Sequence, residues 1–220
     1  MSNIEIKKEK KSILNKIGGD KLILIAAIII VFALFTCLNK NFMTWANMVN
    51  LMVAASLVGL VAVGHTYLII AGQNDLSPGS LAAFCGTLAA LLLSKNVPFI
   101  LTIAVVLLAG VATGFFNAWM VNKIKLEAFI ATLVTQNIMR GFAYIICDGK
   151  PVSISNKAYL TIGKARFLTI PVSVWLMILA FVVFGFILAK TKFGRSVYAI
   201  GGSQEAARLA GLNPQKIVTS

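Results

Sequence analysis

The sequence has 220 residues, of which 59% are hydrophobic and only 12% are charged. Soluble domains carry about 25% charged residues, so this composition excludes an ordinary soluble domain and predicts an integral membrane protein. The net charge of +13 comes from basic residues that stand beside apolar segments rather than in one basic cluster. Membrane topology explains that distribution better than a nucleic-acid partner does.

The first apolar run, residues 22–38, follows six lysines in residues 1–21. At roughly 17 residues it exceeds a typical signal-peptide core, and residues 36–39 (Thr-Cys-Leu-Asn) are a poor cleavage site. As a helix it spans about 26 Å, which is just enough for the hydrocarbon core of a bilayer. We therefore expect an uncleaved first transmembrane helix, with residues 1–21 forming a basic cytoplasmic amino terminus.

Five more apolar segments follow and predict, with the first, an all-α, polytopic transmembrane helical bundle of about six spans. The transmembrane domain is expected over residues 22–189, and a cytoplasmic segment over 190–220. Residues 148–167 are expected to form a polar loop. The predicted spans cover residues 22–38, 48–71, 77–94, 97–121, 128–147 and 168–189.

Three ionisable residues are predicted at or near membrane depth, namely His65, Asp75 and Arg140. Ionisable groups are costly in hydrocarbon and mark functional sites by default. Each also has an ordinary interpretation: a neutral imidazole bonds to a neighbouring helix, Asp75 belongs to an interhelical turn, and Arg140 extends to the lipid headgroups.

Residues 72–80 (Gly-Gln-Asn-Asp-Leu-Ser-Pro-Gly-Ser) are the polar centre of the first half. Pro78 suits the first position of a helix and Ser77 suits its N-cap, so a new helix is predicted to start here. Asp75 lies just before that positive helix end, which favours its charged form. Taken alone, the stretch also fits a short turn with ordinary caps.

The tail predicts a short helix outside the apolar segments, over residues 204–210. Ser203 suits its N-cap, while Glu205 in its first turn and Arg208 in its last match the helix dipole. Gly211 supplies a left-handed stop, and Pro214 is expected to prevent the helix from resuming. A helix of about two turns is unstable alone, so we expect it to dock on another surface.

The tail sequence over residues 198–213 resembles the cytoplasmic coupling segment of ribose/galactose-type (simple-sugar) permease subunits of ABC importers. Residues 72–77 resemble the Gly-Gly-Ile-Asp-Leu-Ser signature of that family, with Gln73 and Asn74 as departures. Residues 129–135 resemble its Phe-Ile-Ala-Thr-Leu-Gly-Thr stretch, with Val134 as a departure. The resemblance implies an ATPase-coupling role for the residues Gly201, Gly202, Glu205, Ala206, Ala207, Arg208 and Gly211.

The resemblance further implies a permease subunit of a binding-protein-dependent importer for a monosaccharide such as ribose or galactose. Its implied partners are an ABC ATPase subunit, a second permease subunit and an extracytoplasmic sugar-binding protein, all acting at the cell membrane. A neutral sugar needs hydrogen-bonding groups rather than a counter-charge. The candidates for its path are therefore the polar residues Gln73, Asn74, Asp75, Asn117, Gln136, Asn137 and Arg140.

No catalytic, cofactor or metal motif stands out in the sequence. A phosphate-binding Gly-x-x-x-x-Gly-Lys-Ser/Thr sequence does not occur, and neither do the usual hydrolase or metal spacings. Cys37, Cys85 and Cys147 lie in or at the ends of apolar runs and are interpreted as small hydrophobic residues. We expect a chain that is not an enzyme and that relies on a separate ATPase.

Two alternatives remain at this stage. An ion-gradient-driven secondary transporter or channel would use His65, Asp75 and Arg140 as an ion relay. A truncated subunit without transport of its own is the other alternative, because members of the resembled family continue through further membrane helices after the coupling segment.

Topology follows from the basic residues outside the six spans. Thirteen Lys and Arg residues fall on the amino-terminal side and six on the opposite side, so the positive-inside rule places both termini in the cytoplasm. In a cysteine-free background, Ser203→Cys is expected to react with membrane-impermeant reagents only in inside-out vesicles. Ser155→Cys is expected to react only in intact cells. Labelling of both positions in intact cells would contradict the six-span topology.

Overall fold

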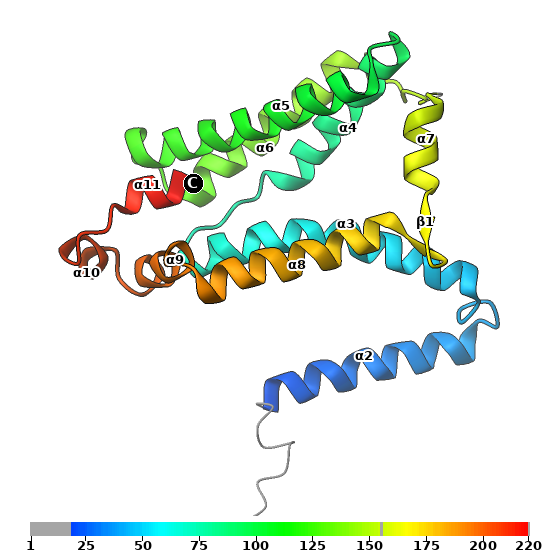
Figure 1. The fold of residues 1–220 in the computed structure, drawn as a ribbon, viewed down its shortest axis with the longest axis horizontal. Coiled ribbons are helices and arrows are strands. Elements are labelled where there is room, and N and C mark those ends of the chain that lie inside the picture. Colours follow the sequence, from blue (N-terminus) through cyan, green and yellow to red (C-terminus); the bar gives the residue numbers. More distant parts are fainter. Residues whose placement is uncertain (1–18, 155, 220) are drawn as a thin grey trace, which may run out of the picture. The chain divides into compact units, whose positions relative to one another are not determined.

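The computed structural model describes residues 19–154 and 156–219, which are almost entirely helical (Figure 1). The chain divides into two compact units, Met1–Leu51 and Met52–Ser220. The predicted basic residues 1–18 and the labelling position Ser155 lie outside the described residues. The predicted all-α helical bundle is confirmed.

Unit 1 contains α2 (Gly19–Leu38) and the first residues of α3 (Trp45–Ile70). A turn joins them, and the Phe42 ring in this turn packs on two rings of α2. Its centroid lies 5.5 Å from that of Phe32 and 5.6 Å from that of Phe35. These contacts fix the turn with apolar rings, as suits a helix end near hydrocarbon.

Three helices of unit 2 pack on one another: α4 (Pro78–Ser94), α5 (Phe99–Trp119) and α6 (Ala128–Ile146). A π-helix, η1 (Met120–Ile124), extends α5. The residues buried on α6 are small, namely Ala131, Thr132, Thr135 and Ala143. Small side chains let helix backbones approach closely where lipid supplies no hydrophobic driving force between helices.

The later part of α3 packs against α8 (Val172–Lys190). The hydroxyl of Tyr67 on α3 donates to the carbonyl oxygen of Phe184 on α8 at 2.5 Å, and their rings lie edge to face. Gly59 of α3 faces Met177 and Phe181 of α8 without room for a further side-chain atom. Aromatic and sulfur contacts therefore fix this helix pair.

Four of these helices are long and apolar enough to cross a membrane by length and composition: Trp45–Ile70, Phe99–Ile124, Ala128–Ile146 and Val172–Lys190. Two shorter apolar helices, Leu22–Leu38 and Pro78–Ser94, occupy the other predicted spans. Large apolar side chains face outward along them, with Ile100 82% and Val182 65% exposed. Such surfaces require lipid or another apolar cover. The crossing of all six helices stays a prediction.

The segment before α8 differs from the sequence-based expectation. The expected polar loop, residues 148–167, contains α7 (Lys157–Lys164) and β1 (Arg166–Phe167). β1 forms a hairpin with β2 (Ile170–Pro171), which lies in the predicted sixth span, and Phe167 pairs with Ile170. Leu168 and Thr169 form its tight turn with φ of 50° and 68°. The sixth helix consequently begins at Val172, after Pro171, rather than near residue 168.

Three short helices form the tail: α9 (Lys192–Gly202), α10 (Gln204–Leu209) and α11 (Pro214–Thr219). The expectation that Pro214 prevents a further helix is wrong. Pro214 opens α11 instead, because a helix start needs no N–H at this position. The Asn213 side chain accepts from the Lys216 backbone N–H at 3.2 Å and caps this start.

The backbone of α9 lies directly against the end of α3. A Cβ atom placed on Gly201 would collide with the carbonyl oxygen of Ile70, the last residue of α3. Gly194, earlier in α9, lies equally close to the carbonyl oxygen of Leu188 near the end of α8. Glycine at these two positions therefore allows α9 to join the ends of both helices.

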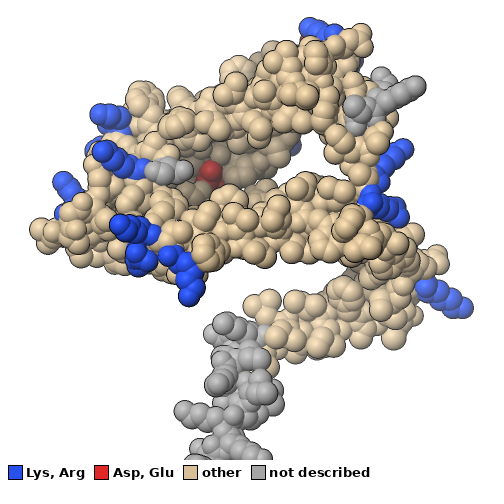
Figure 2. All heavy atoms as spheres, in the orientation of Figure 1, with Lys and Arg blue, Asp and Glu red and all other residues tan. Residues whose placement is uncertain are grey.

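Basic side chains of unit 2 gather at the two ends of its helices, and the surface between them carries few charged side chains (Figure 2). By their positions in the elements, the end that carries η1 and the tail includes Lys123, Lys125, Lys190, Lys192, Arg195, Arg208 and Lys216. The opposite end includes Lys95 and Lys150, which follow α4 and α6, and Lys164 and Arg166, which precede α8. This grouping agrees with the two sets counted from the sequence, while the side of the membrane that each faces stays a prediction.

The junction between α9 and α3 gives a matched pair of glycine substitutions. Gly201→Ala is expected to lower the free energy of unfolding by about 1–3 kcal/mol, because the added methyl group meets backbone that cannot move aside. A Cβ atom on the neighbouring Gly202 would meet nothing within 4 Å, so Gly202→Ala should change it by less than about 0.5 kcal/mol. Thermal unfolding in detergent measures the stability of both variants. Equal melting temperatures for the two variants would contradict the close packing of Gly201 against α3.

Candidate substrate pathway and coupling segment

Residues 71–77 form a non-helical stretch between α3 and α4. The Thr132 hydroxyl of α6 serves their backbone: it accepts from the Leu76 N–H at 3.2 Å and lies 3.4 Å from the Asn74 carbonyl oxygen. Non-helical backbone at membrane depth is tolerated only where protein or a water-filled cavity surrounds it. Thr132 thus replaces the water that would hydrogen-bond this backbone in a soluble loop.

A chain of hydrogen bonds continues from this stretch into α5 and α6. The Thr135 hydroxyl donates to Asn117 Oδ1 at 2.6 Å, and Asn117 Nδ2 donates to the Ser77 hydroxyl oxygen at 3.2 Å. The Ser77 hydroxyl and its backbone N–H both donate to Asp75 Oδ1, at 2.7 and 2.8 Å. Four side chains from three elements are therefore held in one orientation each.

The predicted capping role of Ser77 is wrong. Ser77 has helical dihedral angles and its side chain forms no cap hydrogen bond. The carboxylate of Asp75 accepts its backbone N–H instead, in the local turn that Asp side chains form two residues ahead. Asp75 therefore holds the start of α4, and the Ser77 hydroxyl is free to link it to Asn117.

A cleft of about 240 Å³ opens beside this chain of hydrogen bonds. Four of the predicted pathway residues line it: Gln73, Asn74, Asp75 and Asn117. The other three, Gln136, Asn137 and Arg140, lie further along α6 and do not line it. Asn137 is exposed and donates to the Leu133 carbonyl oxygen of its own helix at 2.8 Å. The structure thus brings together the first four candidates but not the last three.

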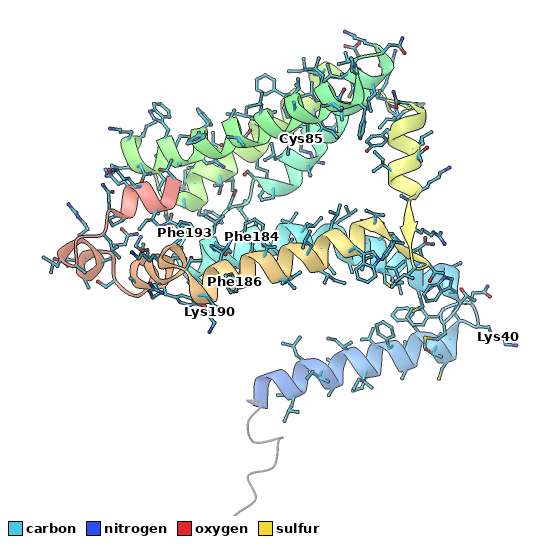
Figure 3. The ribbon with its side chains drawn as sticks, in the orientation of Figure 1. Lys40, Cys85, Phe184, Phe186, Lys190 and Phe193 are labelled. Carbon is cyan, nitrogen blue, oxygen red and sulfur yellow. The ribbon has the colours of Figure 1, made fainter. Side chains whose placement is uncertain are left out.

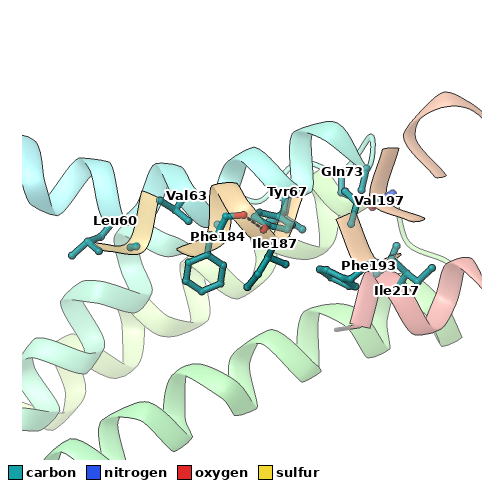
Figure 4. Close-up of a pocket in the computed structure, with 14 residues that line it drawn as sticks. Leu60, Val63, Tyr67, Gln73, Phe184, Ile187, Phe193, Val197 and Ile217 are labelled. Atoms are coloured by element: carbon teal, nitrogen blue, oxygen red, sulfur yellow. Dashed lines mark hydrogen bonds between the residues drawn. The ribbon is translucent and has the colours of Figure 1, made fainter. Parts of the chain in front are cut away.

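A larger cleft of about 600 Å³ lies between α3, α8, α9 and α11. Its lining is almost wholly apolar, and the Tyr67 hydroxyl there is already bonded to the Phe184 carbonyl oxygen (Figure 4). Gln73 stands at its end near Val197 and adds an amide group. This cleft suits an apolar occupant rather than a polar solute.

A third cleft, of about 570 Å³, separates η1 and residue 125 from the tail. Its lining is polar and includes Lys125, Arg208 and, once more, Gln73. Asn122 Nδ2 bridges its rim by donating to the Gln215 carbonyl oxygen at 3.1 Å and to the Thr219 hydroxyl oxygen at 2.8 Å. Gln73 therefore lines all three clefts.

Helix α10 has the caps that the sequence predicts. The Ser203 hydroxyl oxygen accepts the Ala206 N–H at 3.2 Å, and Gly211 has a left-handed φ of 81°. The Leu212 N–H bonds back to the Ala207 carbonyl oxygen at 3.0 Å, which completes a Schellman-type end. The described helix ends at Leu209, one residue before the predicted end.

The exposed face of α10 includes a large apolar side chain beside charged ones. Ala207 is only 3% exposed because it packs inside this chain, whereas Leu209 is 87% exposed. Glu205, Ala206 and Arg208 are exposed as well. The predicted contact role of Ala207 is therefore not open to a partner in this conformation, and Leu209 is a residue that the sequence analysis missed.

The described residues of this region offer no evident metal-binding site. Across residues 19–154 and 156–219, no group of three or more His, Cys, Asp or Glu side chains lies close enough to hold a metal ion.

Of the residues predicted for an ion relay, His65 is half-buried on α3, and Arg140 is exposed on α6. Arg140 lies eight residues beyond Thr132, or about 12 Å along the helix, so it is well separated from Asp75.

Comparison with known proteins places these features in a family. The family described as "Branched-chain amino acid transport system / permease component" matches residues 47–220. The chain is 39% identical over 195 residues to the ribose import permease protein of Haemophilus influenzae, covering 87% of this chain and 60% of that protein. It is 39% identical over 191 residues to the L-arabinose transport system permease protein of Escherichia coli K12, covering 87% and 57%.

A more distant relative is the ribose import permease protein of Bacillus subtilis, 34% identical over 190 residues, with 86% and 59% covered. The chain therefore spans about three-fifths of the length of these relatives. No solved structure matches the chain.

The buried hydrogen-bond chain gives a matched pair of asparagine substitutions. Asn117→Ala is expected to lower the free energy of unfolding by about 1–2 kcal/mol, because Ser77 and Thr135 each lose a partner in a buried place. Asn137→Ala should change it by less than about 0.5 kcal/mol, since that side chain is exposed. Chemical or thermal unfolding of the purified protein compares them, and similar losses for both variants would argue against a structural role for the chain of hydrogen bonds.

Proposed function

Because the chain belongs to the branched-chain amino acid transport system permease family, we propose that it is the membrane-embedded permease subunit of an ATP-driven sugar importer. The observation that carries the proposal is the combination of apolar spans, a polar cleft at non-helical backbone, and a capped helix that exposes Leu209. The relatives are named for ribose and L-arabinose, which makes a pentose the favoured substrate class.

The lining of the 240 Å³ cleft supports a neutral, hydroxyl-rich solute. Gln73, Asn74 and Asn117 supply amide groups, which both donate and accept hydrogen bonds as sugar hydroxyls do. The only acidic residue in its lining, Asp75, already accepts two hydrogen bonds from Ser77. An anionic solute would find no basic residue among the described residues of this lining, so a neutral sugar fits it better than an anion does.

The coupling role is assigned to α10. It is too short to be stable by itself, yet its two caps and the buried Ala207 hold it in place. It presents Glu205, Arg208 and Leu209 to solvent. An exposed leucine flanked by two charges is suited to the centre of a protein interface, and the partner proposed here is an ABC ATPase subunit.

A physical route leads from α10 to the polar cleft. Helix α10 packs on α9, and Gly201 of α9 touches the carbonyl of Ile70. Ile70 directly precedes the non-helical stretch that carries Gln73 and Asp75. A displacement of α10 driven by ATP binding would thus reach the cleft through one rigid junction, which is the mechanism proposed for opening the path.

The remaining partners follow from the same family. We propose a second permease subunit that completes the path and an extracytoplasmic sugar-binding protein that delivers the solute. The tail and both termini are proposed to face the cytoplasm, because more Lys and Arg residues of the sequence fall on that predicted side.

An ion-gradient-driven transporter is less well supported. Its expected relay needs His65, Asp75 and Arg140 close together, whereas within the described residues no hydrogen bond or ion pair joins any two of them. Arg140 lies at a different level of α6 from the cleft. Dissipating the proton gradient while ATP is maintained distinguishes the two mechanisms, since only ion-coupled transport should then stop.

The exposed face of α10 gives a direct test of coupling. Leu209→Ser combined with Glu205→Ala should lower recovery of the partner ATPase in pull-downs at least about tenfold, equivalent to about 1.4 kcal/mol. Lys123→Gln, an exposed change at the same end of unit 2, serves as the control. Membrane abundance and melting temperature should stay near those of the unchanged protein, because both side chains are exposed.

Unchanged ATPase recovery in the double variant would overturn the coupling assignment for α10. Ala207→Trp is unsuitable for this test, because Ala207 is buried within the chain. A tryptophan there would disrupt α10 itself and reduce coupling for a different reason.

A further inference from the structure

We propose that the junction of α8 and α9 binds the headgroup of an anionic phospholipid through Lys190, Lys192 and Arg195. All three side chains are exposed, and Figure 3 shows Lys190 pointing away from the helix at the end of α8. The proposal concerns the contact of this chain with the bilayer and does not depend on its transport activity.

The first argument is a continuous stripe along α8. Leu179, Val182, Phe186 and Lys190 are spaced by three or four residues, so they share one face of the helix. The three apolar members are 58%, 65% and 63% exposed. As α8 is apolar and long enough to cross a membrane, lipid acyl chains are the natural cover for this stripe, which ends at a positive charge.

The second argument is the fixed orientation of α9. Only Thr191 separates it from α8, and the Thr191 hydroxyl oxygen accepts the Gly194 N–H at 3.2 Å. Gly194, Val197 and Ile200 are buried on its inner side. Lys192 and Arg195 consequently face outward, close to the level at which α8 leaves its apolar stretch.

The third argument is charge. The sequence contains no acidic residue between Asp148 and Glu205, and Lys190, Lys192 and Arg195 form no ion pair within the described part of the chain. Tyr198, 55% exposed, lies one turn beyond Arg195 and is a residue type enriched at the membrane interface. Three cations beside an interfacial tyrosine complement a phosphate-bearing, negatively charged headgroup.

Lipid retention tests the proposal on the full chain. The purified protein is incubated in detergent micelles that hold equal amounts of phosphatidylglycerol and phosphatidylcholine. The lipids that remain after affinity chromatography are then quantified. We expect phosphatidylglycerol to be enriched at about 0.1 M NaCl and the enrichment to fall at about 1 M, where the Debye length shrinks from about 10 Å to 3 Å.

Substitution identifies the residues involved. The triple variant Lys190→Gln, Lys192→Gln, Arg195→Gln should reduce the enrichment at least about tenfold, since each cation near an anionic surface contributes about fivefold. The control triple variant Lys95→Gln, Lys150→Gln, Lys164→Gln removes the same charge at the opposite end and should retain it within about twofold. A charge-preserving triple variant, Lys190→Arg, Lys192→Arg, Arg195→Lys, should also retain it.

Several outcomes overturn the proposal. Equal losses in the two Gln variants would indicate a general charge effect, and displacement of the lipid by millimolar inorganic phosphate would indicate a free-phosphate site. Undiminished enrichment in the first variant, with reduced ATPase recovery, would assign this face to a protein partner. If that variant fails to fold, the salt dependence of the unchanged protein decides, and salt-independent enrichment contradicts the proposal.

Discussion

The non-helical backbone between α3 and α4 depends on hydrogen bonds from neighbouring helices, because lipid offers none. The Thr132 hydroxyl oxygen of α6 accepts from the Leu76 N–H, and Asn117 Nδ2 of α5 donates to the Ser77 hydroxyl oxygen. These side chains are useful only while α4, α5 and α6 keep their positions. The need to hydrogen-bond this backbone also explains why the polar cleft lies beside residues 71–77, since clustered backbone and amide groups need polar surroundings.

The fold could be predicted largely because lipid imposes a simple rule on sequence. A span needs about 20 apolar residues, and the predicted runs coincide with helices whose ends differ by a few residues. The sixth predicted span shows the limit of this rule. Leu168 is apolar, yet it belongs to a hairpin turn, because the helix begins only after Pro171. The caps of α10 were predictable for a similar reason, because Ser203 and Gly211 act through bonds to nearby backbone.

The site could be predicted only in part, because packing decides which face of a helix is covered. Gln136 and Asn137 have suitable chemistry and spacing, yet they lie away from the cleft that Asn117 lines. Thr132 and Thr135 lie in the stretch 129–135 that resembles the permease family, but only the structure shows which groups they contact. Ala207 and Leu209 show the same limit, because the neighbours of α10 bury the first and expose the second.

The tail is connected to the membrane helices by two kinds of contact that respond differently to force. At Gly201 and Gly194 backbone meets backbone, and no side-chain rotation relieves a displacement there, since close-packed interiors transmit strain. At α11, which packs on α5 and α9, the Asn122 amide adds two hydrogen bonds to Gln215 and Thr219, and these bonds re-form with water when broken. In the proposed coupling mechanism, a displacement of α10 is transmitted through α9 to Ile70. Residues 71–77 follow Ile70 directly, so the stretch most dependent on its neighbours is also the first to receive the displacement.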